Sequence, residues 1–275
     1  MLLIPNSRGQ GHANVSISDA MAEELVGNDF KRSKEKFYNL QKGLLNVSNE
    51  SYEWARSHPH SIFMGGDHLT SYATVLSSYK RYKNNFRLVW IDAHTDIHSF
   101  NSSPSWNLHG MVVRLLLNKC LKPEQVLFIG IRSSEDEELK YIKDSAIQCI
   151  MMKDWKNNKL NSIKVLKNFI SGYPVHVSFD VDALDPTIMS STGTPVNNGF
   201  CLNDFSTIIN TIRSEGLHIA TDIMEFNPNL GYFESSFKTL KKVVNILKKK
   251  VKKTSKQTKQ SMYKKNQTRK NHKLN

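Results

Sequence analysis

Six side chains of the kinds that bind metal ions lie in three short clusters, each directly after an apolar run. These residues are His68, Asp92, His94, Asp96, Asp180 and Asp182. The apolar runs before them, 61–64, 86–91 and 175–179, have the composition of buried strands. Burying an unpaired charge costs several kcal/mol, so carboxylates at the ends of such strands need positive charge beside them. A pair of divalent cations supplies that charge, and the sequence therefore predicts a two-metal site.

The composition of this set indicates which metal it would hold. Four carboxylates and two imidazoles with no thiolate favour Mn²⁺ or a similar ion over structural zinc. Two such ions, about 3.5–4 Å apart, share a bridging water and lower its pKa, which provides hydroxide at neutral pH. Helix capping at strand-to-helix turns is the competing interpretation of each cluster alone. Three clusters together favour the metal site.

The elements that position these clusters follow from the pattern of apolar residues. Strands are predicted at 2–4, 61–65, 86–92, 126–131, 147–152, 175–181 and 218–224. Helical patterning lies between several of them, at 69–82, 108–119, 135–144, 159–171 and 203–215. This alternation predicts an α/β fold with one mostly parallel β-sheet sandwiched by helices. Ligands gather at the carboxyl ends of the strands in such sheets, where the three clusters lie.

The last part of the chain divides into a predicted closing helix and a basic tail. An apolar stripe at spacings of 3 and 4 predicts a helix over 235–251, formed by Phe237, Leu240, Val244, Leu247 and Val251. Residues 252–275 lack this periodicity and are expected to form a disordered Lys-rich tail, which leaves 1–251 as a single catalytic domain. Residues 241–275 hold 14 of the 38 Lys and Arg and no acid, so the rest has 24 basic against 25 acidic residues, a net charge of −1.

The composition of the chain argues against a membrane-spanning or secreted protein. No run of 18 apolar residues occurs, so we expect no membrane span, and the first residues are too soon polar for a signal peptide. Three scattered cysteines are typical of a reducing compartment, and we expect a cytoplasmic protein. His176 and His218 lie within predicted strands and are interpreted as core or pocket-wall residues and not as ligands.

Four segments resemble the signatures of the ureohydrolases. They are Gly65-Gly66-Asp67-His68, Asp92-Ala93-His94-Thr95-Asp96-Ile97, 178–186 and Asp222-Ile223-Met224-Glu225-Phe226-Asn227-Pro228. Within that superfamily, Asn107-Leu108-His109-Gly110 and Thr192-Gly193-Thr194-Pro195 resemble arginase and not agmatinase. The resemblance extends from the first strand to about residue 250 and implies the arginase-like fold.

The resemblance implies a role for each matching residue. One manganese ion would be bound by His68, Asp92, Asp96 and Asp180, and the other by Asp92, His94, Asp180 and Asp182. Asp96 would orient the hydroxide that attacks the guanidinium carbon, His109 would carry a proton toward the leaving amine, and Glu225 would pair with the guanidinium.

The amino-acid end of the substrate would be bound by a second group of residues. The resemblance implies contacts from 96–107 through His98, Ser103, Ser105 and Asn107, and from an acidic loop through Glu135 and Glu138. Thr194 is a further expected contact. His98 stands where arginases usually have Asn, and Trp106 where they have Gly. A ring at 106 would either narrow the pocket or change the loop.

These observations favour a binuclear manganese arginase that hydrolyses L-arginine to L-ornithine and urea. A related enzyme acting on agmatine or a guanidino acid is the nearest alternative. A different class is an inactive ureohydrolase fold that binds nucleic acid or an acidic partner through its basic tail. The resemblance also implies a homo-oligomer, a trimer or hexamer.

Overall fold

The computed structural model describes residues 1–9 and 16–249, so the predicted tail, 252–275, lies outside the described residues. Its strands are β1 (Leu2–Ile4), β2 (Lys31–Arg32), β3 (Ser61–Gly65), β4 (Arg87–Ile91), β5 (Val126–Ile131), β6 (Gln148–Met151), β7 (Pro174–Asp180) and β8 (Leu217–Met224). They form one sheet in the order β2-β1-β3-β8-β7-β4-β5-β6, and every pairing is parallel. The predicted α/β fold with a parallel sheet is confirmed.

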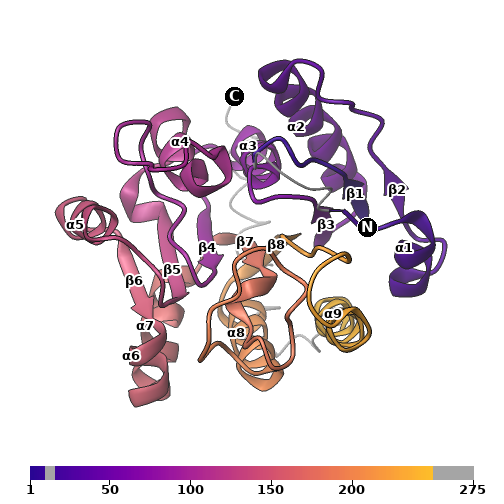
Figure 1. Cartoon of the computed structure of the whole chain (residues 1–275). Helices are drawn as coiled ribbons and strands as arrows, with labels where there is room; N and C mark the ends of the chain where they lie inside the picture. Colours follow the sequence, from indigo (N-terminus) through magenta and orange to yellow (C-terminus); the bar gives the residue numbers. More distant parts are fainter. Residues whose placement is uncertain (10–15, 250–275) are drawn as a thin grey trace, which may run out of the picture.

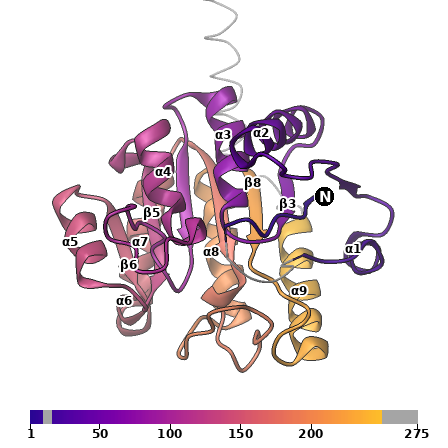
Figure 2. The same ribbon diagram turned by 45° about the horizontal axis from the view of Figure 1, so that its top comes forward.

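Helices cover both faces of the sheet (Figure 1). They are α1 (Asp19–Val26), α2 (Leu40–Ser57), α3 (Thr70–Tyr82), α4 (Val112–Lys119), α5 (Asp136–Asp144), α6 (Met152–Asn157), α7 (Lys159–Ile170), α8 (Leu202–Glu215) and α9 (Phe233–Lys248), with short 3₁₀ helices η1 (Leu108–Met111), η2 (Pro123–Gln125) and η3 (Val181–Ala183). Figure 2 shows α2, α3 and α4 on one side of the sheet and α8 and α9 on the other.

Two apolar cores follow from this layering. One lies between the sheet and α1, α6, α7, α8 and α9, and the other between the sheet and α2, α3, α4 and α5. Because side chains alternate along a strand, β7 sends Val175, Val177 and Phe179 into the first core. Its other face carries His176 and Ser178, which lie buried against α3. Parallel strands covered on both faces are buried along most of their length, as β7 is from Val175 to Asp180.

Most predicted elements are present, and a few were missed. The closing helix, predicted over 235–251, is α9, and Phe237, Leu240, Val244 and Leu247 are buried as predicted. It ends at Lys248, because Lys249 has extended backbone angles, and Val251 lies outside the described residues. Helix α2 was missed because its buried face carries Gly43, Ser48 and Ser51 among its leucines and valine, which weakens the apolar period. Within residues 1–9 and 16–249, no helix combines the length and apolar character needed to cross a membrane.

Candidate metal centre and active site

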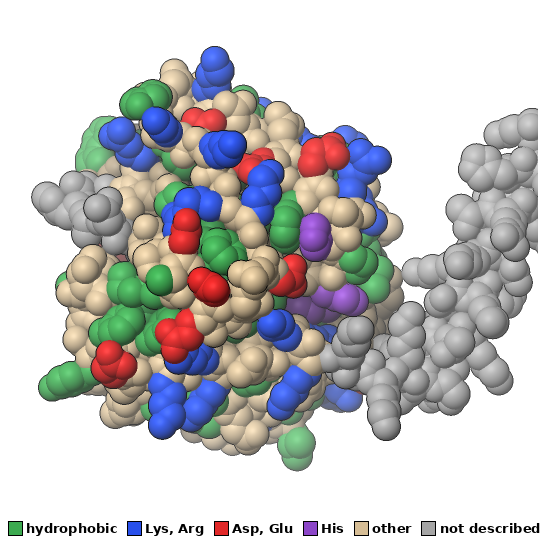
Figure 3. All heavy atoms as spheres, turned by 90° about the vertical axis from the view of Figure 1, so that its right-hand side faces the viewer, with side chains coloured by type: hydrophobic (Ala, Val, Ile, Leu, Met, Phe, Trp, Pro, Cys, Tyr) green, Lys and Arg blue, Asp and Glu red, His purple; other side chains and the backbone are tan. Residues whose placement is uncertain are grey.

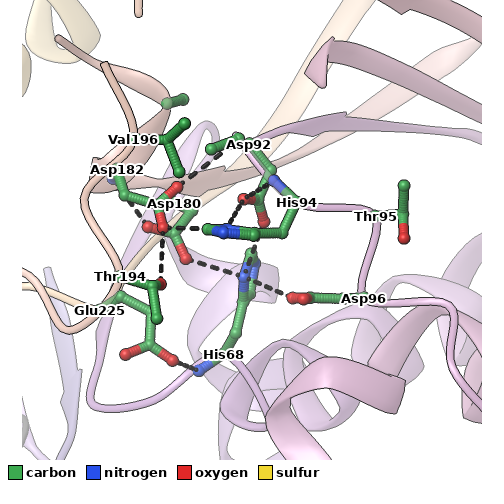
Figure 4. A network of polar contacts seen from close by, with 12 residues as sticks. His68, Asp92, His94, Thr95, Asp96, Asp180, Asp182, Thr194, Val196 and Glu225 are labelled. Carbon is green, nitrogen blue, oxygen red and sulfur yellow. Dashed lines mark hydrogen bonds and ion pairs between the residues drawn. The ribbon is translucent and has the colours of Figure 1, made fainter. Parts of the chain in front are cut away.

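Four neighbouring strands of the sheet, β3, β8, β7 and β4, bring the predicted site residues together at their carboxyl ends. His68 follows β3, and 92–96 follow β4. Asp180 ends β7, Asp182 lies in η3, and Glu225 follows β8. Figure 4 shows the six predicted ligands facing one another above the sheet edge, with Glu225 and Thr194 beside them.

The first group of ligand atoms surrounds the His68 imidazole. Its Nδ1 lies 3.1 Å from Asp92 Oδ2, 3.0 Å from Asp96 Oδ2 and 3.1 Å from Asp180 Oδ2. Its Nε2 is 3.0 Å from the Ser178 hydroxyl, and the ring stacks on Trp90 with 4.1 Å between centroids. The Ser178 contact occupies Nε2, so that Nδ1 is left to face the carboxylates.

The second group lies around His94. Its Nδ1 is 3.1 Å from Asp182 Oδ2 and 3.5 Å from Asp92 Oδ1. Asp92 therefore contributes one oxygen to each group. Backbone amides hold the carboxylates in place: Asp92 Oδ1 accepts from His94 N at 2.8 Å, and Asp180 Oδ1 accepts from Asp182 N at 2.8 Å.

Burial of so many carboxylates together changes their protonation. Burial and the neighbouring acids raise the pKa of Asp96 and that of Asp180 above the usual value, and raise the pKa of Asp182 to about 6. For His94, burial lowers the pKa, but the Asp182 and Asp92 carboxylates outweigh it and raise the pKa to about 12. These carboxylates repel one another, and the site requires positive charge between them.

The donor set fits a pair of divalent cations. His68, Asp92 and Asp96 each offer a ligand atom within 4.8 Å of the others, and so do Asp92, His94 and Asp182. In the described part of the chain, buried His68 Nδ1 makes no hydrogen bond although it faces three carboxylate oxygens. A metal ion at that point would satisfy both the nitrogen and the oxygens. The two imidazoles and oxygen-rich surroundings suit Mn²⁺ or a similar ion.

His109 and Glu225 form a pair next to the ligands. His109 Nδ1 lies 3.3 Å from Glu225 Oε1, which also accepts a hydrogen bond from His68 N at 2.8 Å. Burial lowers the pKa of His109, but Glu225 outweighs it, with Asp96 and Asp67 adding to the effect, so that the pKa is raised. Glu225 and Asp96 both adopt left-handed backbone conformations, with φ of 65° and 48°. Such strain at two candidate site residues is typical of functional positions.

A cleft of about 220 Å³ opens over these residues. Of the predicted substrate-binding residues, those that line it are His98, Glu135, Glu138, Thr194 and Glu225. Glu138 is already engaged, because its carboxylate accepts from the Thr95 hydroxyl and, at 2.9 Å, from Glu135 N at the start of α5. His98 Nε2 lies 3.5 Å from Glu138 and 3.8 Å from Glu135, so His98 lies against the acidic wall of the cleft.

Three predicted residues lie outside this lining. The Ser103 hydroxyl accepts from Trp106 N at 3.0 Å, and that of Ser105 accepts from Asn107 N at 3.3 Å, so both shape their own loop. Asn107 immediately precedes η1. The Trp106 ring is 68% exposed and is not part of the cleft wall, and its φ of 59° lies in the left-handed region that favours glycine. Tryptophan therefore keeps a backbone shape suited to Gly and leaves the cleft open.

Several lining or supporting residues escaped sequence reasoning. Ser133 and Ser134 line the cleft directly after Arg132. The Arg132 guanidinium donates to the carbonyl oxygens of Asp182 at 2.7 Å and Val196 at 2.8 Å, so it ties the ligand turn to the loop of Thr194. The sequence signal for Ser133, Ser134 and Arg132 was their position directly after a predicted strand. Serine and arginine are common in such loops whether or not the loop has a function, so the position did not identify them.

Comparison with known proteins shows the same fold and related sequences. Residues 6–247 match the family model described as "Arginase family". An arginase of Glaciozyma antarctica is 32% identical over 249 residues, which cover 81% of this chain and 71% of that protein. The crystal structure of an arginase from Bacillus subtilis has a TM-score of 0.79 at 25% identity, covering 91% of this chain and 98% of that one. A structure described as a hypothetical agmatinase from Burkholderia thailandensis shares the fold, with a TM-score of 0.69 at 20% identity over 79% of this chain and 67% of that one.

Proposed function

This chain belongs to the arginase family and is a hydrolytic enzyme of the ureohydrolase type, and we propose that it converts L-arginine and water to L-ornithine and urea at a two-manganese site. The observation that carries the proposal is the grouping of six ligand side chains with the His109–Glu225 pair at one edge of the sheet. We propose that the first ion is held by His68, Asp92, Asp96 and Asp180, and the second by Asp92, His94, Asp180 and Asp182.

The bound ions would supply positive charge and a water of lowered pKa as nucleophile. Glu225 lies beside the ligands with its Oε1 fixed by His68 N, and a carboxylate is the complementary partner of a planar guanidinium. Glu225 thus orients the guanidinium carbon toward the nucleophile.

Two residues handle protons in this reaction. Asp96, which lines the cleft beside the other ligands, accepts a proton from the attacking water. His109, whose pKa is raised by Glu225 against the effect of burial, holds a proton at neutral pH more readily than a free imidazole. Water oxygen bonds to the guanidinium carbon, the bond from that carbon to the side-chain nitrogen breaks, and His109 gives its proton to the departing amine. The second water proton leaves the oxygen as the carbonyl of urea forms. That proton and the one on Asp96 restore the proton of His109 and convert the amine to its ammonium form.

The opposite wall of the cleft supports an amino-acid substrate. Glu135 is the acid there that faces the α-amine, because the carboxylate of Glu138 is occupied by Thr95 and by the start of α5. The serine hydroxyls that line the cleft, available to an α-carboxylate, are Ser133 and Ser134. His98 and Thr194 complete this end, while Ser103, Ser105 and Asn107 support the loop beside it.

Agmatine is the second candidate substrate. The described residues that line the cleft include the non-ligand acids Glu135, Glu138 and Glu225 but no Lys or Arg. Such a wall suits a substrate with two cationic ends, and agmatine has a guanidinium and an amine without a carboxylate.

Urea release by the manganese-loaded full chain, with L-arginine, agmatine and 4-guanidinobutyrate compared, tests the proposal. If hydroxyls in the cleft bind the α-carboxylate, kcat/KM for L-arginine exceeds that for agmatine by at least about 100-fold. Agmatine lacks this carboxylate, so binding it would leave those hydroxyls buried without a hydrogen-bond partner. Comparable or faster turnover of agmatine would assign the enzyme to the second substrate. Urea from none of the three would overturn the proposed function.

Cytoplasmic location, a homo-oligomeric state and binding of nucleic acid or an acidic partner by residues 252–275 stay predictions. Each rests on composition or resemblance, and the tail lies outside the described residues.

A further inference from the structure

We infer that Asp67 is a positioning residue that acts on His109 through the backbone of Gly9. The inference rests on the proposed function, in which His109 gives a proton to the leaving amine. It concerns a carboxylate that is neither in the proposed ligand set nor part of the cleft lining.

Asp67 is a fully buried carboxylate between two backbone donors. Its side chain has 0% exposure. Oδ2 accepts from Gly9 N at 2.5 Å, and Oδ1 accepts from Leu69 N at 3.1 Å. The Asp67 backbone N–H donates to Asn6 O at 2.8 Å, which fixes the same segment from its other end. Asp67 therefore secures the stretch that follows β1 against the turn that follows β3.

Gly9 passes this constraint to His109. The Gly9 carbonyl accepts from His109 N at 3.2 Å. His109 is the second residue of η1, and the side chain of Asn107, the residue before that helix, makes no capping hydrogen bond. The first amides of a helix lack partners within it and need an acceptor from elsewhere. Gly9 O is such an acceptor, and Asp67 binds the N–H of the same residue.

Glycine is required at position 9 by the closeness of this contact. A Cβ there would lie 2.7 Å from Leu69 Cβ and 3.0 Å from Asp67 Cγ. The first distance is too short for a side chain and the second is tight, so any larger residue would push the segment away from Asp67 and Leu69. The close approach of the Gly9 backbone to the Asp67 carboxylate therefore depends on glycine at position 9.

Two adjacent residues thus hold the proposed proton donor from two sides. The His68 amide fixes Glu225 Oε1, which contacts the His109 ring. The Asp67 carboxylate fixes Gly9, which contacts the His109 backbone. Proton transfer needs the donor within hydrogen-bond reach of the leaving nitrogen, and a shift of about 1 Å in such a group costs up to about 100-fold in rate.

The Asp67→Asn substitution tests the contact with little change in shape. An amide has one acceptor oxygen, and its NH₂ group cannot accept, so the variant side chain loses the hydrogen bond from either Gly9 or Leu69. Gly9→Ala disturbs the same contact from the other side while leaving Asp67 in place. Asp204→Asn is the matched control, because Asp204 accepts hydrogen bonds from Trp155 and Lys159 at the start of α8, away from the cleft lining.

The experiment is a double-mutant cycle on kcat in the full, manganese-loaded chain, joined to amide hydrogen exchange. We expect Asp67→Asn and Gly9→Ala to lower kcat by about 10- to 100-fold with KM changed less than about threefold. In the His109→Ala background the same substitutions should change kcat by less than about twofold, because their effect passes through His109. Exchange of the His109 amide should quicken in both variants and stay unchanged in Asp204→Asn.

A loss of kcat by the same factor in both backgrounds would overturn the inference, since it would show a general effect on folding or metal binding. An unchanged rate of His109 amide exchange in Asp67→Asn would overturn it as well. The exchange measurement needs no turnover. If the wild-type chain releases no urea, the proposed function is refuted. The exchange rate of the His109 amide in the variants would still test the Asp67–Gly9–His109 contact.

Discussion

At the scale of single residues, His109 and Glu225 share one contact but have different proposed roles. Their side chains are 3.3 Å apart, and both line the cleft. We predict that His109→Ala mainly lowers kcat, by roughly 10²–10⁴, as expected when a general acid is removed. Glu225→Gln should lower kcat/KM strongly, because it removes the charge that orients the guanidinium. Steady-state kinetics with L-arginine measures both, and wild-type rates in either variant would contradict that residue's role.

Substitution of a ligand that binds both metal ions should lower the metal content more than substitution of a ligand that binds one ion. Asp92 contributes an oxygen to each of the two ligand groups, whereas Asp182 belongs to one. Asp92→Asn should therefore lower the occupancy of both ions, and Asp182→Asn chiefly that of the ion beside His94. Elemental analysis after manganese loading and gel filtration distinguishes the two results. Equal losses from both variants would argue against Asp92 as the bridge.

How far a residue's place could be predicted depended on whether its neighbours formed an ordered motif. The six ligands and Glu225 lie in motifs at strand ends, His109 lies in the motif that begins η1, and the structure brings all eight together. Ser133 and Ser134 were missed because two serines after a strand carry no pattern. Ser103 and Ser105 were expected in the cleft because their stretch resembles the arginase substrate-binding stretch, but their hydroxyls hold their own loop. Side-chain direction in an irregular loop depends on local hydrogen bonds that a linear sequence does not reveal.

At the scale of elements, β8 carries a histidine that should make the fold sensitive to acid. His218 was interpreted as a core or pocket-wall residue. It is a core residue, 3% exposed, with Nε2 2.7 Å from the Thr221 hydroxyl. Burial, with smaller effects from Arg213 and His60, lowers the pKa of His218 to about 3. The unfolded chain has a value of about 6.5, so below that pH the unfolded state binds a proton that the folded state does not. The free energy of unfolding should therefore fall as pH falls from about 6.5 toward about 3.

This effect amounts to about 2 kcal/mol between pH 6.5 and pH 4.5. Denaturant unfolding of wild type and His218→Gln across that range measures it, and His58→Gln controls for replacing a histidine outside the core. The Gln variant should show a smaller loss of stability with acid. An identical pH dependence in wild type and His218→Gln would contradict the prediction.

Helices and strands were predictable from the sequence where a long run of their buried residues is apolar, and less so where the element is short or its buried residues are polar. Strands such as β5, with six buried residues in a row, were found nearly to the residue. The two-residue β2 and the short α1 and α6 offer too few residues for a periodicity to emerge. Parallel pairing between distant strands followed from the alternation of element types, but the strand order depends on packing across the whole sheet.

At the scale of the whole molecule, the body and the tail differ in charge. Figure 3 shows basic and acidic side chains mixed over one face of the body, in keeping with the net charge of −1 outside residues 241–275. Every proposed ligand, catalytic residue and substrate-binding residue lies between 68 and 225. Deleting 252–275, with nine Lys and Arg, should leave urea release unchanged and abolish any salt-dependent binding to nucleic acid. Loss of urea release on truncation, in an assay that compares both chains at equal manganese, would refute this.

The central claim is that two metal ions at this edge of the sheet make the chain a guanidinium hydrolase. Its most direct test is to strip the full chain with a chelator, titrate it with Mn²⁺, and follow urea release from L-arginine at each addition. We predict no activity in the stripped protein and a rise that saturates at about two equivalents per chain. Full activity without added metal, or saturation at one equivalent, would contradict the account.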